Sequence, residues 1–263
     1  MPIAVAFLPQ EPVTLTGGCS CKASRHVVKI PALEDRPLVP EALPTPIGPS
    51  DDGGNTVPTR FPLVDLDHCD SCRRISGAII QCWLICPADW VEWSLTPRTG
   101  SGSGSEESSE VGLGHKDDDG ENSSPGKTAG GGEGDRIHLS TLAAVSSQPR
   151  LKGGVRGDGA PVARGDTYLA HFNSSPDVTR TFCARCGTNL TFFFDRPPPH
   201  GVLPIVDITA GSLDRDSITR IQPERHGWWD DGIDWVKELL RKGDGGFLIR
   251  HPSGAVNRAV QDR

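Results

Sequence analysis

The sequence predicts a mainly β fold that is interrupted by long loops. Four segments have the composition of β-strands, and a helical period appears only near the C-terminus. The 31 glycines and 23 prolines indicate that much of the 263-residue chain does not belong to a packed core.

The predicted strands are rich in β-branched, aromatic and aliphatic residues and are bounded by Gly, Pro or Asp. They cover residues 25–30, 78–86, 168–172 and 190–194. Side chains alternate along a strand, so Cys82, Leu84 and Cys86 should share one face of the second segment. We therefore expect Cys82 and Cys86 to be buried thiols that pack as small hydrophobic groups, and not metal ligands.

One helix is predicted near the C-terminus, where apolar residues recur at helical spacing beside charged ones. The recurring residues are Ile233, Val236, Leu239 and Leu240. Three tryptophans, Trp228, Trp229 and Trp235, lie at the start of this segment. We expect them to cover one end of the β core, with a wall of a substrate pocket as the alternative.

The domain organisation follows from the composition of the loops. A single domain is expected over residues 13–240, interrupted by a proline-rich loop at 31–62 and by an acidic Gly/Ser-rich insertion at 97–136. The insertion has almost no apolar residues and is predicted to be disordered, as is a flexible tail at 241–263. Residues 101–135 carry nine acids and two lysines, a net charge of −7, which equals that of the whole chain. The remainder is electrically balanced, so the charge does not predict a nucleic-acid partner.

Six of the eight cysteines form three close pairs. The pairs are Cys19 and Cys21, Cys69 and Cys72, and Cys183 and Cys186. Thiolates separated by one or two residues can bind one zinc ion, because a short turn directs both sulfurs inward. Alternatively, the paired cysteines could each be half of a disulfide in an exported protein. This is disfavoured because residues 1–12 have no basic region before a short apolar stretch, as a signal peptide would. No apolar run is long enough to span a membrane. We expect a cytoplasmic protein with reduced thiols and no membrane partner.

The residues around the cysteine pairs resemble the signatures of the glutathione-dependent formaldehyde-activating enzyme family, which includes the centromere protein V-like proteins. The segments that carry the resemblance are GGCSC at 17–21, HCDSCRRISGA at 68–78, RTFCARCGTNL at 180–190, GSLD at 211–214, and residues 223–236. The resemblance implies several small, coiled antiparallel sheets around two zinc positions. It also implies that the first and last pairs close a structural zinc site, made of Cys19, Cys21, Cys183 and Cys186.

The second zinc position of the family is formed by a Cys-x-Cys-x-x-Cys group that leaves one metal position open. Here Asp67 stands in place of the first cysteine, so the resemblance implies a catalytic site made of Asp67, Cys69 and Cys72. Aspartate is an accepted zinc ligand but a harder one, which should weaken zinc binding. His68 as a ligand is an alternative, disfavoured because a residue between two ligands points away along an extended segment. A degenerate second site without metal is the other alternative.

An open zinc position suits thiol substrates, because the metal stabilises a bound thiolate beside an electrophile. The resemblance implies a carbon–sulfur lyase that condenses glutathione, or a similar thiol, with formaldehyde or a related electrophile. Arg73 and Arg74 could bind the carboxylates of the thiol, or simply be solvated. His226 could assist proton transfer, although a structural role is favoured.

A different class of function also fits the sequence. The four-cysteine site would then stabilise a non-catalytic binding module, and the acidic insertion would recruit partners. Asp67 in place of a cysteine favours this alternative. The sequence does not specify an oligomeric state.

Overall fold

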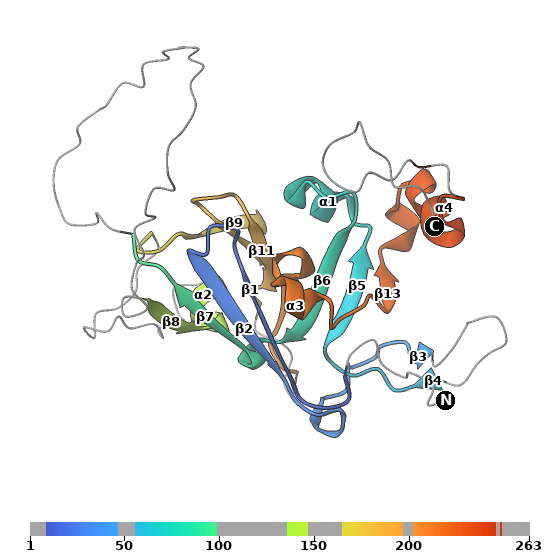
Figure 1. Cartoon of the computed structure of the whole chain (residues 1–263), viewed down its shortest axis with the longest axis horizontal. Coiled ribbons are helices and arrows are strands. Elements are labelled where there is room, and N and C mark those ends of the chain that lie inside the picture. Colours follow the sequence, from blue (N-terminus) through green and yellow to red (C-terminus); the bar gives the residue numbers. More distant parts are fainter. Residues whose placement is uncertain are drawn as a thin grey trace, which may run out of the picture.

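A computed structural model shows two main β-sheets with short helices at their edges, and a separate two-stranded sheet (Figure 1). The structure describes residues 9–46, 56–98, 136–146, 165–196, 202–245 and 248. The mainly β fold class is thereby confirmed. Of the predicted acidic insertion at 97–136, residues 99–135 lie outside the described residues. The predicted flexible tail at 241–263 begins too early, because Arg241 and Lys242 belong to a helix; residues 246–247 and 249–263 lie outside the described residues.

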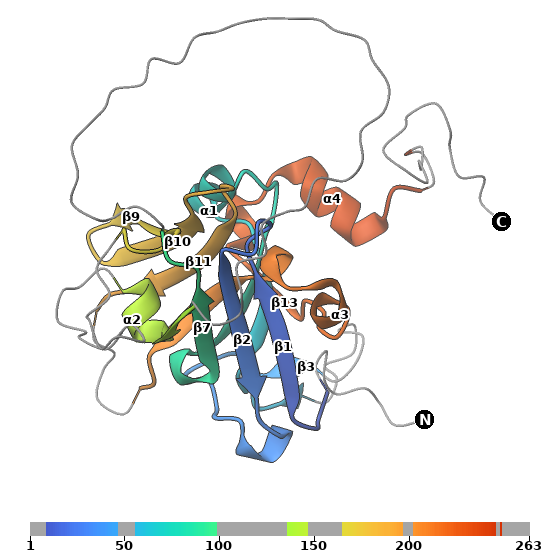
Figure 2. The same ribbon diagram turned by 60° about the vertical axis from the view of Figure 1, so that its left-hand side comes forward.

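The smaller sheet has four antiparallel strands in the order β1-β2-β7-β8. Its strands are β1 (Val13–Gly18), β2 (Ser24–Ile30), β7 (Val91–Leu95) and β8 (Ile137–Ser140). Figure 2 shows β1, β2 and β7 side by side. The β1–β2 hairpin turn carries the first cysteine pair.

The larger sheet has seven strands in the order β13-β5-β6-β12-β11-β10-β9. All neighbours are antiparallel except β13 and β5, which run parallel. Its strands are β5 (Leu63–Asp67), β6 (Gln81–Pro87), β9 (Leu169–Ser175), β10 (Val178–Cys183), β11 (Asn189–Phe194), β12 (Ile205–Thr209) and β13 (Arg225–Gly227). This sheet is larger than the small sheets implied by the resemblance.

The hydrophobic core lies between the two sheets. Leu15, Val28 and Trp93 come from the small sheet, and Leu84 and Ile208 from the large one, all within one buried cluster. Cys82 and Cys86 belong to the core side of β6, as expected for packing thiols: Cys86 is buried and Cys82 packs against the cluster. Because side chains alternate, the residues between these core positions face the second side of the large sheet.

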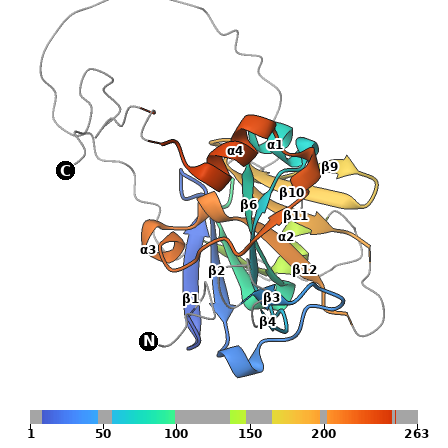
Figure 3. The same ribbon diagram turned by 90° about the vertical axis from the view of Figure 1, so that its right-hand side faces the viewer.

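The predicted C-terminal helix is present as α4 (Asp234–Lys242). Three further short helices were not predicted: α1 (Asp70–Ser76), α2 (Thr141–Val145) and α3 (Arg215–Ile218). Figure 3 shows α1 and α4 at one end of the molecule and α3 beside β1. None of the described helices is long and apolar enough to cross a membrane.

The expectation that the tryptophans cover the β core is wrong for two of them. Trp228 and Trp235 are 67% and 59% exposed. Trp229 packs instead against the rings of His68 and His226, at centroid distances of 5.1 and 4.7 Å.

In the proline-rich loop, the described part contains a 3-10 turn at Leu33–Asp35 and a two-stranded sheet of β3 (Thr45–Pro46) and β4 (Thr56–Val57).

Candidate metal centres

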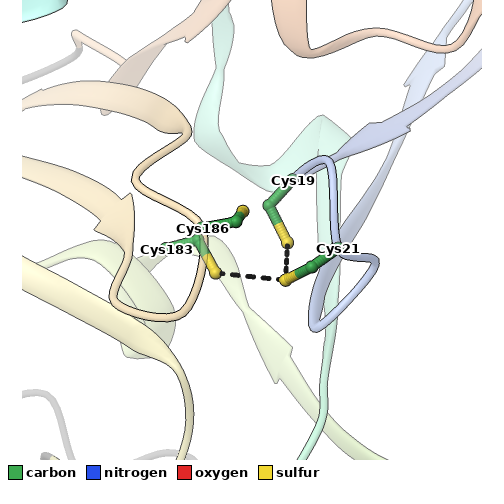
Figure 4. Close-up of side chains that lie close together, drawn as sticks. All are labelled: Cys19, Cys21, Cys183 and Cys186. Atoms are coloured by element: carbon green, nitrogen blue, oxygen red, sulfur yellow. Dashed lines mark hydrogen bonds between the residues drawn. The ribbon is translucent and has the colours of Figure 1, made fainter. Parts of the chain in front are cut away.

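The first candidate centre joins the two sheets through two hairpin turns. Cys19 and Cys21 lie in the β1–β2 turn, while Cys183 ends β10 and Cys186 lies in the turn that leads to β11 (Figure 4). All four sulfurs lie within 4.8 Å of one another. The Cys19–Cys21 and Cys21–Cys183 sulfur distances are 3.5 and 3.6 Å. A zinc tetrahedron with Zn–S bonds of about 2.3 Å has sulfur–sulfur edges of roughly 3.8 Å, so the donor set fits this ion.

The local backbone explains how each turn presents its sulfurs. Gly187 has a φ of 75° and donates its N–H to the Cys183 carbonyl at 2.8 Å, which closes the β10–β11 turn around the sulfur. In the other turn, Cys19 N–H donates to the Ser24 carbonyl at 2.9 Å, and Ser24 N–H donates to Cys19 Sγ at 3.2 Å. An N–H that points at a sulfur stabilises its negative charge, as expected around a metal-bound thiolate.

Protonation of the four-cysteine site differs between its members. Burial raises the pKa of Cys19 and raises that of Cys183 to about 12. The pKa of Cys186 is instead lowered to about 6. Burial acts to raise it, but hydrogen bonds with Thr188 and Cys21 act in the opposite direction and have the larger combined effect. Binding of a metal dication must therefore release protons from Cys19 and Cys183, so metal affinity at this site rises with pH.

The second candidate centre lies where β5 passes into α1. The ligand atoms of Asp67, Cys69 and Cys72 lie within 4.8 Å of one another. Asp67 ends β5, Cys69 is the N-cap of α1, and Cys72 lies in the first turn of this helix. The structure thus brings together the three residues that the sequence singled out, and it leaves a fourth position without a protein ligand from the described residues.

Asp67 is held rigidly by two hydrogen bonds. Its Oδ1 accepts from the Cys69 N–H at 2.8 Å, and its Oδ2 accepts from Trp83 Nε1 at 2.9 Å. Each carboxylate oxygen has a second lone pair, so the side chain can still bind a metal. Bonds of this kind orient metal ligands in proteins. The same two bonds also give Asp67 a structural reason to be there, independent of any metal.

Burial and neighbouring acids shift several pKa values around this centre upward. Burial and a hydrogen bond with Asp67 raise the pKa of Cys72 to about 12, opposed by Arg180. Burial, with Asp67 as a further cause, raises the pKa of Asp65 to about 7. The pKa of Asp207 rises to about 8 through burial and the charges of Asp65 and Asp67. The raised pKa values reflect burial and repulsion among these acids, and a bound cation would relieve that repulsion.

His68 turns away from the second centre, as its position between two ligands predicted. Its Nε2 lies 3.1 Å from His226 Nδ1, and both rings contact Trp229. His226 therefore packs against His68, from the neighbouring strand β13. Gly232 completes this packing, since a Cβ there would lie 2.7 Å from His68 Nδ1.

Arg73 and Arg74 both pair with Asp70 on the same helix. Arg73 Nη2 donates to Asp70 Oδ1, and Arg74 Nη1 lies 4.0 Å from Asp70 Oδ2. A ligand carboxylate would have to compete with Asp70 for either arginine. The structure does not show either side chain directed at the second centre.

Sequence reasoning missed the side chains that surround the second centre. Arg180 Nη2 lies 3.3 Å from Cys72 Sγ, and Trp83 bonds to Asp67. The available signal was alternation: Arg180, Trp83 and Asp207 each lie beside a core residue on their strand, so all face the second side of the large sheet.

In comparisons with known proteins, no family model matches this chain, and no curated protein matches it.

Proposed function

We propose that this protein is a zinc-dependent carbon–sulfur lyase-like enzyme that acts on the adduct of a thiol, such as glutathione, with formaldehyde or a related electrophile. The observation that carries the proposal is the second centre, where two cysteines and one aspartate converge and a fourth ligand position is free of described protein groups. Catalytic zinc sites commonly have three protein ligands and one open position, whereas structural sites have four. The first centre, with four cysteines, has the structural composition.

The residues of the chain divide the work at this site. Asp67, Cys69 and Cys72 would hold the zinc ion, which when bound supplies Lewis acidity and stabilises a substrate thiolate. Trp83 and the Cys69 N–H orient Asp67 through the bonds described above. Asp67 and Cys72 are buried, which shields these two ligands from water, whereas Cys69 is half-buried. Arg73 and Arg74 stay candidates for the carboxylates of the thiol, provided that they leave Asp70.

The proposal is tested by metal content and by thiol chemistry. Reduced, freshly purified protein should contain two zinc ions per chain by elemental mass spectrometry, and Cys69→Ser should contain one. The zinc-loaded parent should bind glutathione and accelerate its condensation with formaldehyde, and Cys69→Ser should do neither. Two zinc ions without thiol binding or any effect on thiol–aldehyde condensation would refute the enzyme.

The second candidate function is a non-catalytic, zinc-stabilised binding module. It is favoured by the two hydrogen bonds that occupy Asp67, because they explain the aspartate without a metal. One zinc ion in both the parent and Cys69→Ser would support it. A variant lacking residues 101–135 gives an independent test, since an enzyme should keep its activity whereas a recruiter should lose its partners in a pull-down.

A further inference from the structure

Arg180 is a buried cation without a carboxylate partner among the described residues. The residue is 3% exposed, and its Nη1 is buried without a hydrogen-bond partner in the part of the chain that the structure describes. Its Nε donates to Ser174 Oγ at 3.1 Å, and its Nη2 donates to Cys72 Sγ at 3.3 Å. Burying an unpaired guanidinium is costly, so the fold must hold negative charge close to it.

Aromatic rings fix the guanidinium in place. Its central carbon lies 4.7 Å from the centroid of Phe192 and 6.0 Å from that of Trp83. Trp83 is the same side chain that bonds to Asp67. Arg180 and Asp67 are therefore linked through one indole ring, on the face of the large sheet that bears the second centre.

The charge of the second centre explains why a cation belongs beside it. A carboxylate and two thiolates carry three negative charges, so a bound dication leaves a net charge of −1 before any fourth ligand enters. An anionic fourth ligand would then be repelled, whereas a neutral one would not. A fixed positive charge in contact with Cys72 Sγ offsets that excess. Asp207 faces the same region, but burial and the charges of Asp65 and Asp67 raise its pKa to about 8, which weakens it as a competitor for the charge of Arg180.

We propose that Arg180 is a positioning residue of the second metal centre, which offsets the excess negative charge of Asp67, Cys69 and Cys72 and makes the open position select an anionic sulfur ligand over a neutral one. The inference rests on the second metal centre of the proposed function. It does not depend on the lyase reaction itself.

The test compares two small ligands on the full-length protein loaded with Co²⁺, whose absorption reports on bound thiolate. The thiol is 2-mercaptoethanol and the neutral ligand is imidazole, titrated into the parent, Arg180→Gln and Arg180→Lys. Arg196→Gln is the matched control, since it removes an exposed arginine whose partner among the described residues is Asp177 on the surface. Metal affinity is measured in parallel by competition with a chromogenic chelator, and folding by thermal melting.

In Arg180→Gln, the ratio of thiol affinity to imidazole affinity should fall on the order of tenfold to a hundredfold. The metal affinity of the second centre should fall by a similar factor. Arg180→Lys should retain part of the selectivity, and Arg196→Gln all of it. If Arg180→Gln does not fold, Ser174→Ala replaces it: losing the Nε anchor should lower the ratio several-fold while the charge stays.

Three outcomes separate the claims. An unchanged ratio in a folded Arg180→Gln, or in Ser174→Ala where that variant stands in, overturns the role of Arg180 and leaves the proposed enzyme standing. If Arg180→Gln loses thiol binding selectively but the parent does not affect thiol–aldehyde condensation, the role of Arg180 is supported and the proposed enzyme is refuted. A parent that binds only one metal ion overturns both.

Discussion

His26 should make the stability of this protein depend on pH between about 3 and 6.5. His26 is 1% exposed, and neither ring nitrogen has a hydrogen-bond partner among the described residues. Burial lowers its pKa from 6.5 to about 3, helped by the charge of Arg25 and opposed by that of Asp214. The folded protein thus keeps this histidine neutral at a pH where the unfolded chain binds a proton.

The sign and size of the effect follow from this difference. Between the two pKa values the unfolded state binds more protons, so the free energy of unfolding falls as the pH falls, by up to about 1.4 kcal/mol per pH unit. From pH 7 to pH 5, above the folded-state pKa of about 3, the loss from His26 is about 2 kcal/mol. Replacing the imidazole with an apolar side chain of similar size removes this contribution. It also removes two buried nitrogens that have no hydrogen-bond partner among the described residues.

The assay is urea unfolding of the parent and of His26→Leu at pH 7 and pH 5. Loss of metal at low pH lowers the stability of both proteins equally, so the informative quantity is the difference between their two pH-dependent losses. We expect the parent to lose about 2 kcal/mol more than His26→Leu. Equal losses in the two proteins would refute the reasoning.

Three further substitutions test other parts of the structure. Cys183→Ser should remove one metal ion per chain and unfold the protein or strongly lower its melting temperature. The reason is that a structural zinc site contributes about 10–16 kcal/mol of apparent binding free energy, whereas the total stability of a protein is about 5–15 kcal/mol. A melting temperature equal to that of the parent would contradict a structural site. Gly17→Ala would place a Cβ 2.5 Å from His26 Nε2 and should cost about 1–3 kcal/mol in urea unfolding, with an unchanged midpoint as the contrary result. Trp83→Phe removes the donor to Asp67 Oδ2 and should weaken metal binding at the second centre about tenfold while the first centre keeps its metal; equal loss at both centres would mean general unfolding.

The features that the sequence predicted correctly are those set by short-range spacing. The strand around Ser24–Ile30 and the helix at Asp234–Lys242 carry their periods within one segment. Cys69 and Cys72 are three residues apart, so one helical turn brings both beside the end of β5. The joining of the first and last cysteine pairs spans 162 residues from Cys21 to Cys183, and only the family resemblance supplied it.

The features that escaped prediction depend on contacts between distant segments or on very short elements. Helix α1 has only seven residues, too few for an apolar period, and it begins at a cysteine without a side-chain cap. Arg180 alternates with threonines in β10 and has the pattern of a surface residue on a strand. It is buried because α1, 108 residues earlier, places Cys72 against it. No local pattern encodes such docking.

The two candidate centres differ in what holds their ligands, and this difference bears on their roles. In the first centre, the sulfurs come from hairpin turns of different sheets, so the bound ion itself would join the sheets. In the second, all three ligands lie within six residues. Hydrogen bonds from Trp83 and the Cys69 backbone hold Asp67, and one from Arg180 holds Cys72. An ion bound at the first centre would thus carry part of the fold, which suits a closed structural site. The second centre is preorganised by the protein and depends little on the ion for its shape, which is the arrangement that lets a metal exchange its fourth ligand without disturbing the fold.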